Sequence, residues 1–235
     1  MEQEYKVQYK DGEQEEEKYL KRAGDVQIVY ANGDTFVGSV DSNLLKQGNG
    51  KYIWQNPSSD EDNRGLIISL LQIRFDAVYY RAGKEFASYD GNYLDGVKQG
   101  IGKMIFPNGD IYHGEWKDDK MHGEGAFMYA NGDIYSGEFE QGIREGQGTY
   151  EYAADRSMLT GKWVMNALID GRWKFKNGGE YIGRFENGKP IGPCVLKSRS
   201  GLQIEAEYVK VSEADASGDV IVHHKCINGT IPRHP

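Results

Sequence analysis

Cysteine, proline and long apolar runs are scarce in this sequence, and each shortage excludes a class of protein. The two cysteines among 235 residues, Cys194 and Cys226, imply no disulfide framework, so we expect a reducing, cytosolic setting. No apolar stretch opens the chain, and we expect neither a signal peptide nor a membrane anchor. The net charge of −8 argues against nucleic-acid binding, which requires a concentrated basic face.

Catalytic motifs are also missing. The sequence contains no Walker motif, no Gly-x-Ser-x-Gly and no Gly-x-Gly-x-x-Gly fingerprint. His223, His224 and Cys226 lie close together, but their spacing matches no standard zinc pattern. Glu115 and Glu138 recur at matching positions, and we expect them to be solvated charges on a strand face. We therefore predict a protein that is not an enzyme, with no catalytic residue, cofactor or metal.

Glycine and tyrosine, by contrast, are abundant, with 31 and 16 residues, and they recur periodically. Between Tyr89 and Tyr152 one phrase returns every 23 residues: an aromatic residue, a glycine and a second aromatic residue in alternate positions. A Gly-x-Gly follows each opening aromatic residue after eleven and thirteen positions. A fixed period of this length is typical of a stacked repeat protein. The three copies are Tyr89, Gly91, Tyr93, Gly100 and Gly102; Tyr112, Gly114, Trp116, Gly123 and Gly125; and Tyr135, Gly137, Phe139, Gly146 and Gly148.

Each copy predicts a β-hairpin. The alternation of Tyr112, Gly114 and Trp116 with polar residues is typical of a strand with one covered face. Aromatic residues also follow the second glycine at two and four positions, as in Phe127 and Tyr129, so both strands carry aromatic columns. Asn-Gly then links one unit to the next, and we expect type I′ turns there, because this dipeptide supplies positive φ. These dipeptides are Asn32-Gly33, Asn108-Gly109 and Asn131-Gly132.

The glycines are expected to be structural. Gly114 and Gly137 lie between two aromatic residues of one strand face, where a side chain would block the packing of a ring from the neighbouring unit. Gly123-x-Gly125 is expected to make the tight bend back into the second strand. The predicted structural glycines are Gly91, Gly100, Gly102, Gly114, Gly123, Gly125, Gly137, Gly146, Gly148 and Gly183.

The pattern predicts an all-β, elongated single-sheet array of about six stacked hairpins with degenerate ends. In a fifth unit, Leu159 and Trp163 flank Gly161, with Gly171 in the first glycine slot and Trp173 in the second. A sixth opens at Tyr181-Ile-Gly183-Arg-Phe185, with Cys194 in the second glycine slot. An incomplete unit with a strand at Val26 to Tyr30 comes before the first. The predicted boundaries are a disordered acidic tail at 1–22, the first units at 23–54, an insertion at 55–88, tandem repeats at 89–198 and capping strands at 199–235.

The insertion interrupts the array between Trp54 and Tyr89. Within it, the apolar segment 66–80 is compatible with an extra strand or with a helix face. Three interpretations of the insertion stay open: a surface segment that folds back on the stack, an element that binds a partner, and an artefact of the gene model.

Aromatic identity, glycine spacing and Asn-Gly closure together make this sequence resemble the MORN repeat (membrane occupation and recognition nexus). Over roughly residues 89 to 208, the order of motifs is similar to that of the MORN proteins of the ciliary radial spoke head and their meichroacidin-type relatives. The similar stretch includes Gly148-Thr-Tyr-Glu-Tyr152, Gly161-Lys-Trp163 and Asn187-Gly-Lys-Pro-Ile-Gly192, and it ends in Glu207-Tyr208. The resemblance implies a non-enzymatic cytoskeletal scaffold in the cytoplasm, placed in the axoneme of a cilium or flagellum. Its partners would be other axonemal or cytoskeletal proteins.

We expect a partner to dock in a groove lined by the repeated aromatic residues. The predicted groove residues are Tyr89, Tyr93, Tyr112, Trp116, Tyr135, Phe139, Trp163, Tyr181 and Phe185. The alternative is a peripheral membrane adaptor that binds anionic phospholipids or phosphoinositides. It would use a weak basic edge of Lys98, Lys117, Lys120 and Arg144. A homodimer through exposed edge strands is a further possibility.

Overall fold

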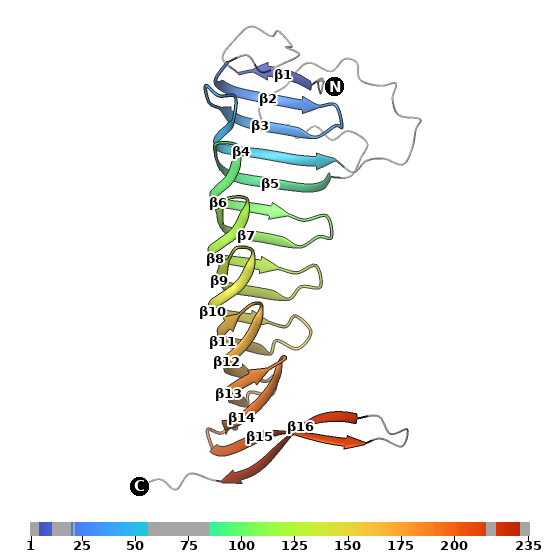
Figure 1. The fold of residues 1–235 in the computed structure, drawn as a ribbon, viewed down its shortest axis with the longest axis vertical. Coiled ribbons are helices and arrows are strands. Elements are labelled where there is room, and N and C mark those ends of the chain that lie inside the picture. Colours follow the sequence, from blue (N-terminus) through green and yellow to red (C-terminus); the bar gives the residue numbers. More distant parts are fainter. Residues whose placement is uncertain (1–4, 11–19, 21, 56–84, 215–219, 231–235) are drawn as a thin grey trace. The chain divides into compact units, whose positions relative to one another are not determined.

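The aromatic pattern forms strands throughout the described chain. The computed structural model describes residues 5–10, 20, 22–55, 85–214 and 220–230. They fall into two units, Met1–Gly109 and Asp110–Pro235, and all regular elements within the described residues are strands. In each unit, every strand pairs antiparallel with the next along the sequence, which confirms the prediction of an all-β fold of stacked hairpins (Figure 1).

The first unit contains β1 (Tyr5–Tyr9), β2 (Gly24–Tyr30), β3 (Thr35–Val40), β4 (Lys46–Gln55), β5 (Glu85–Leu94) and β6 (Val97–Ile105). The second contains β7 (Ile111–Lys117), β8 (Lys120–Met128), β9 (Ile134–Glu140), β10 (Ile143–Glu151), β11 (Met158–Val164), β12 (Ala167–Lys174), β13 (Glu180–Glu186), β14 (Lys189–Lys197), β15 (Gln203–Ala214) and β16 (Val220–Thr230).

The Asn-Gly loops are not the type I′ turns that the sequence predicted. In the loop from β8 to β9, Gly132 N–H donates to the Tyr129 carbonyl at 2.8 Å, and only Gly132 has a positive φ, of 89°. This is a three-residue loop in which glycine alone takes the left-handed conformation. Asn131 instead accepts a hydrogen bond from the Asp133 N–H through its side chain, at 3.0 Å. The asparagine therefore fixes the loop by capping and not by its own backbone.

Positive φ at two successive residues occurs at the opposite hairpin ends. Asp118 and Asp119, between β7 and β8, have φ values of 50° and 65°, the pattern of a type I′ turn. Asn187-Gly188, with φ values of 51° and 73°, is the Asn-Gly pair that fits the predicted type.

The Gly-x-Gly segment forms a bulge inside a strand and not the bend between strands. Gly114 pairs with Gly125, but the next residue, Glu115, pairs with His122, so two residues of β8 are left over. Gly123 lies in this bulge with a φ of 55°. Such an irregularity bends the strand and increases its twist.

Glycine also faces glycine across each hairpin of this type, as in Gly91↔Gly102, Gly114↔Gly125 and Gly137↔Gly148. In the fifth unit, Gly161 pairs with Gly171, so Gly171 takes the second glycine position and not the predicted first. Trp173, which pairs with Leu159, then takes the position that Phe127 has opposite Tyr112. The hairpin of the fifth unit is one residue shorter than the hairpin of Gly114 and Gly125, and for this reason the sequence prediction placed Gly171 one glycine position too early. In the sixth unit, Cys194 pairs with Gly183, at the second glycine position that the sequence predicted.

The ends of the array differ in detail from the predicted boundaries. The segment predicted to be a disordered tail contains β1, whose Val7 and Tyr9 are buried and pair with Ile28 and Val26. Val7 and Tyr9 alternate with polar residues, so the strand has one apolar face. The prediction of disorder rested on the charged composition of the segment and missed this alternation.

The predicted insertion at 55–88 also overlaps the array, since β5 begins at Glu85 and pairs with β4. The apolar segment 66–80, predicted as a strand or a helix, lies outside the described residues. At the other end, the two predicted C-terminal strands are β15 and β16. β15 pairs with β14 over Gln203–Tyr208, and with β16 over most of its length.

Candidate functional site

The nine predicted groove residues are all buried, with exposures of 0 to 6 %. In the second unit, Trp116, Tyr112, Phe139, Tyr135 and Trp163 form a continuous ladder of edge-to-face rings, and Tyr181 and Phe185 form a separate pair. Tyr112 contacts Trp116 and Phe139 with centroid distances of 5.3 and 5.1 Å, and Tyr135 contacts Phe139 and Trp163 at 5.2 Å each. Ring pairs of this geometry are favourable beyond the area that they bury. These residues thus form the core of the hairpin stack, and their contact with a partner stays a prediction.

Tyr89, Tyr112 and Tyr135 are each fitted over the glycine pair of their own hairpin. The Tyr112 hydroxyl donates to the Glu115 carbonyl at 2.9 Å, and the Tyr135 hydroxyl donates to the Glu138 carbonyl at 3.1 Å. A Cβ on Gly125 would lie 2.4 Å from the Tyr112 oxygen. The glycines therefore make room for a ring of the same hairpin, and not for a ring of the neighbouring unit as the sequence suggested. Burial raises the pKa of Tyr135 to about 12, because the phenolate would be poorly solvated.

The accessible aromatic surface comes from the second strand of each hairpin. Phe127, Tyr129, Tyr150 and Tyr152 are only partly buried. Their rings form a continuous tilted row with successive centroid distances of 4.7, 5.6 and 4.9 Å. We call these four residues the ring row. The sequence predicted an aromatic column on each of the two strands of a hairpin. The predicted groove took its residues from the first strands, whose column is buried, because alternation alone does not show which column becomes buried.

A buried aspartate supports the ring row. Asp133 accepts hydrogen bonds from the Tyr150 hydroxyl at 2.7 Å, from the Ala153 N–H at 2.8 Å and from the Asn131 side-chain amide at 3.0 Å. The Ala153 and Tyr150 bonds lower its pKa below the ordinary value, since they favour the charged form. The aspartate that follows each Asn-Gly thus anchors the next hairpin, a role that sequence reasoning missed.

A cation lies beside the same rings. The Arg144 guanidinium carbon is 4.7 Å from the centroid of Trp163 and 5.5 Å from those of Tyr135 and Tyr150. Arg144 also donates through Nη2 to the Asn166 carbonyl at 2.7 Å. A guanidinium over aromatic faces is held by cation–π attraction.

The first unit repeats this arrangement. The Lys46 ammonium is 4.2 Å from the centroid of Tyr52 and 5.1 Å from that of Phe36. Tyr52 in turn contacts Tyr30 and Trp54, and its hydroxyl donates to Asp34 at 2.9 Å. Tyr30, Tyr52 and Trp54 thus form the ring row of the first unit. In both units, one cation and one buried aspartate accompany the ring row.

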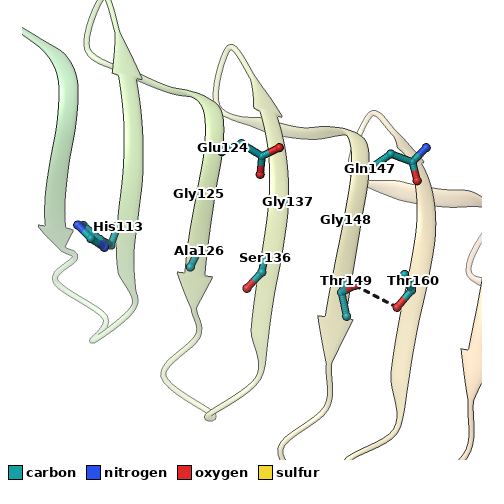
Figure 2. Close-up of a pocket in the computed structure, with 10 residues that line it drawn as sticks. All are labelled: His113, Glu124, Gly125, Ala126, Ser136, Gly137, Gln147, Gly148, Thr149 and Thr160. Atoms are coloured by element: carbon teal, nitrogen blue, oxygen red, sulfur yellow. Dashed lines mark hydrogen bonds between the residues drawn. The ribbon is translucent and has the colours of Figure 1, made fainter.

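The opposite face of the second sheet is polar and shallow. A groove of about 570 Å³ crosses β7 to β11, and small side chains of neighbouring strands line it (Figure 2). Ala126, Ser136, Thr149 and Thr160 follow one register row, and the two threonine hydroxyls are 3.0 Å apart. The lining contains His113 and Glu124 as its only ionisable residues, and no nucleophile is paired with a base there. This groove has no arrangement suited to catalysis.

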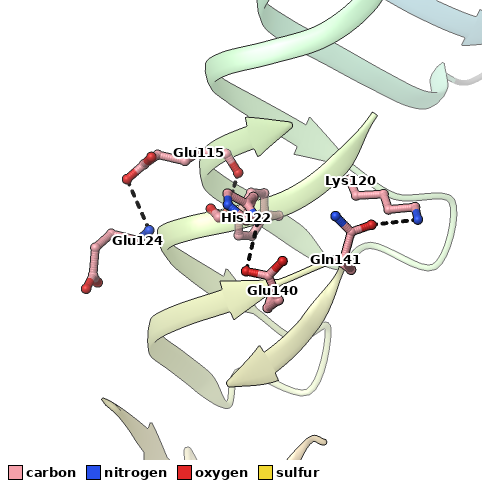
Figure 3. A network of polar contacts seen from close by, with 7 residues as sticks. Glu115, Lys120, His122, Glu124, Glu140 and Gln141 are labelled. Carbon is pink, nitrogen blue, oxygen red and sulfur yellow. Dashed lines mark hydrogen bonds and ion pairs between the residues drawn. The ribbon is translucent and has the colours of Figure 1, made fainter. Parts of the chain in front are cut away.

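The repeated glutamates are not simply solvated, which corrects the sequence prediction. Glu115 accepts the Glu124 N–H at 3.1 Å (Figure 3), and in the next hairpin Glu138 accepts the Gln147 N–H at 2.7 Å. Each carboxylate thus fills the bulge of the next strand, where a Cβ on Gly123 would lie 2.6 Å from Glu115 Cδ. Close by, His122 Nδ1 is 3.5 Å from Glu140 Oε2 (Figure 3).

Within the described residues, no group of three or more His, Cys, Asp or Glu side chains gathers as metal ligands would. The side chains of His223 and His224 lie outside the described set. Cys194 is buried, Cys226 is exposed, and both are free thiols. No helix in the described part of the chain could cross a membrane.

The fold and its aromatic face define a repeat protein built from antiparallel β-hairpins on a ladder of stacked rings. The MORN repeat model matches residues 45–56, 89–111, 112–134, 135–154 and 181–203, so these segments of the chain carry MORN repeats. The unmatched stretch 155–180 contains the shortened fifth hairpin, β11 and β12. No curated protein matches the chain.

Among solved structures, the chain is similar to the TCP10 domain of Danio rerio CPAP, with 13% identity and a TM-score of 0.41 over 89% of this chain and 91% of that one. It is also similar to the SAS-4 (dCPAP) TCP domain of Drosophila melanogaster, solved in complex with a proline-rich motif of Ana2 (dSTIL). There the identity is 19% and the TM-score 0.23, over 54% of this chain and 84% of that one. Both scores are too low for the likeness to indicate a function.

Proposed function

We propose that this protein is a non-enzymatic scaffold of the cytoskeleton that binds a segment of a neighbouring protein across its ring row. The observation that carries the proposal is the ring row itself: four contiguous, partly exposed aromatic side chains over a fully packed ladder. Aromatic side chains with one apolar surface and one polar end are enriched at protein interfaces. MORN repeats suggest a scaffold for proteins or membranes, and the ring row favours proteins.

The ring row is held in place before any partner arrives. Tyr150 is fixed by Asp133 at one end of its side chain and packs at 4.9 Å against Tyr152. A surface that is already ordered loses little conformational entropy on binding, so its contacts convert more fully into affinity. Such a surface suits a permanent structural contact.

We place this scaffold in the axoneme of motile cilia. The support is the order of motifs over roughly residues 89 to 208, which is similar to that of radial-spoke MORN proteins. A photo-reactive residue at Tyr152 should cross-link to one axonemal neighbour in cilia stripped of membrane by detergent. The same residue at exposed Thr160, on the opposite face, should not. Release of the protein with the membrane fraction, or equal cross-linking from both positions, would contradict the proposal.

The membrane adaptor remains the alternative, but its basic edge is largely engaged within the protein. The Lys98 ammonium lies 5.6 Å from the Tyr89 ring, Arg144 lies over three rings, and Lys120 donates to Gln141 at 2.8 Å. An anionic membrane attracts clustered cations that are free to face it. Flotation with phosphoinositide vesicles should therefore show weak binding, and tight, salt-sensitive binding would reverse the ranking.

A homodimer stays a prediction as well. β16 is the last strand of the second unit, and within the described residues no strand pairs with its outer edge. Sedimentation velocity over a range of concentrations tests this.

A further inference from the structure

We propose that Arg144 selects the partner's charge, so that the segment docking on the ring row carries a carboxylate that pairs with this guanidinium. The inference rests on the proposed function and adds the chemistry of the partner: an apolar segment with an acidic residue beside its anchoring side chain.

The first support is the position of Arg144. Its guanidinium carbon lies 5.5 Å from the Tyr150 centroid, so the charge borders the ring row directly. The side chain is half-buried in β10, flanked by Trp163 and tied to the Asn166 carbonyl. Burial raises the pKa of Tyr129 and Tyr152, and the positive charge of Arg144 partly opposes that rise. Arg144 therefore interacts with all three tyrosines of the ring row.

The second support is the missing counter-charge. Among the described residues, no carboxylate lies within ion-pair distance of Arg144, although other arginines of the second unit are paired. Arg156 is 2.8 Å from Glu151, and Arg172 is 3.8 Å from Glu180. Those two arginines are largely exposed, whereas Arg144 has given up part of its hydration without gaining an anion.

Two acids of this part of the sheet already accept other hydrogen bonds. Asp133 uses both carboxylate oxygens on Tyr150, Ala153 and Asn131. Glu145 accepts the Met165 N–H at 2.9 Å. A guanidinium has five N–H donors in a planar fork, and a bidentate carboxylate is the partner that this fork fits best. Arg144 therefore has donors left for an incoming carboxylate.

The third support is recurrence in the first unit. Lys46 lies over Tyr52, Phe36 and Tyr93, with its ammonium 4.2 to 5.4 Å from the ring centroids. In a chain with a net charge of −8, both ring rows have a cation beside them. A single cation enclosed by rings fits a peptide carboxylate next to an apolar side chain. A membrane surface would instead favour several cations spread over an open face.

The test uses a random dodecapeptide library displayed on phage and panned on the full chain. We expect the wild-type protein to enrich peptides in which an acidic residue has a fixed spacing from apolar anchors. Arg144→Glu should enrich basic residues at that position instead. Arg144→Gln should bind the wild-type-selected peptides about tenfold to a hundredfold more weakly, as expected for the loss of a charge-assisted hydrogen bond. Lys162→Glu is the matched control, because Lys162 is exposed on the opposite face, and it should behave as wild type.

The outcomes separate this inference from the proposed function. Apolar peptides that lose binding in Tyr152→Ala, but show no acidic preference, would overturn the inference and leave the proposed function standing. Absence of any enrichment would overturn both. Phosphoinositide vesicles that bind the wild type and not Arg144→Gln, without peptide enrichment, would assign the cation to a lipid phosphate and overturn the inference. Thermal melts show whether each variant folds. If Arg144→Glu does not fold, the loss of affinity in Arg144→Gln tests the inference.

Discussion

Glycine and tyrosine act as one unit at the scale of single residues. A tyrosine ring lies flat over the glycine pair of its own hairpin, and its hydroxyl reaches the carbonyl three residues further on. The ring requires the glycines, because any side chain there would occupy its space. The glycines in turn depend on the ring, which covers backbone that would otherwise be exposed. Neither residue type explains the repeat alone.

Gly148→Ala tests this fit. The added Cβ would lie 2.3 Å from the Tyr135 oxygen and 2.5 Å from its Cζ, and the ring is fully buried against Phe139 and Trp163. We expect a loss of about 1–3 kcal/mol in the free energy of unfolding, as for other overpacked cores. Urea denaturation measures it. Ser136→Ala, at an exposed position, is the control and should change stability by less than about 0.5 kcal/mol. Equal stability of the two variants would contradict the fit.

Asp133 gives a prediction about pH. Its pKa is lowered in the folded protein by the Ala153 N–H and the Tyr150 hydroxyl, so its stabilising effect is complete above the ordinary aspartate range. It is lost as the pH falls through the lowered pKa, when the folded protein must take up the proton. We expect Asp133→Ala to cost about 1–3 kcal/mol near neutral pH, since it leaves three part-buried donors, on Tyr150, Ala153 and Asn131, without their acceptor. The difference from wild type should shrink in acid. A difference independent of pH would exclude this role.

At the scale of the element, the two ends of each hairpin follow different rules. The ends joined by three-residue loops use one left-handed glycine and a capping asparagine. The two-residue turns place both residues at positive φ, and Asp118-Asp119 does so without a glycine.

Asp118→Asn combined with Asp119→Gly should stabilise the protein by up to about 1 kcal/mol, because this pair is the favoured type I′ sequence and relieves positive φ at non-glycine residues. The midpoint of thermal unfolding measures the gain. The same replacement at Ala130-Asn131 is the contrasting case, because neither residue has a positive φ and the cap to Asp133 would be lost. If that variant gained stability too, the distinction between the two loop types would be wrong.

Sequence reasoning succeeded where one local pattern determines the structure. The alternation around Gly114 and Gly137 predicted the strands, and the period predicted their stacking order. It failed where structure depends on pairing. Type I′ turns were assigned to Asn-Gly although only the register reveals a three-residue loop, and Gly171 was misplaced because a one-residue deletion is invisible without its partner Gly161. Which of the two aromatic columns stays accessible depends on how adjacent hairpins cover the rings, as Phe139 and Trp163 cover Tyr135. Alternation along one strand does not show this.

At the scale of the whole molecule, each hairpin contacts its immediate neighbours, so stability is expected to be local. Trp163 shows how adjacent hairpins are joined. It donates from its indole N–H to the Gly148 carbonyl at 3.0 Å and packs against Tyr135.

Trp163→Ala should cost about 3–5 kcal/mol, as for other buried tryptophans, and the loss should be confined. Hydrogen exchange should show reduced protection in β9 to β12 and nearly unchanged protection in β15. Phe185→Ala is the matched variant, with losses centred on β13 and β14. A uniform loss of protection over the second unit in either variant would mean that it unfolds as a single cooperative body.

The pairing of β4 with β5 has a consequence for how such proteins diversify. Tyr52 faces Tyr89 and Gly50 faces Gly91 in ordinary register, although residues 56–84 separate the two strands in sequence. The spatial neighbours are therefore specified by the hairpins themselves and not by the length of the connection. Every loop on that edge is a position where evolution, or a protein engineer, can add a segment without rewriting the repeats. A reporter or binding module inserted at Ala153-Ala154 would be carried by the array in the same way.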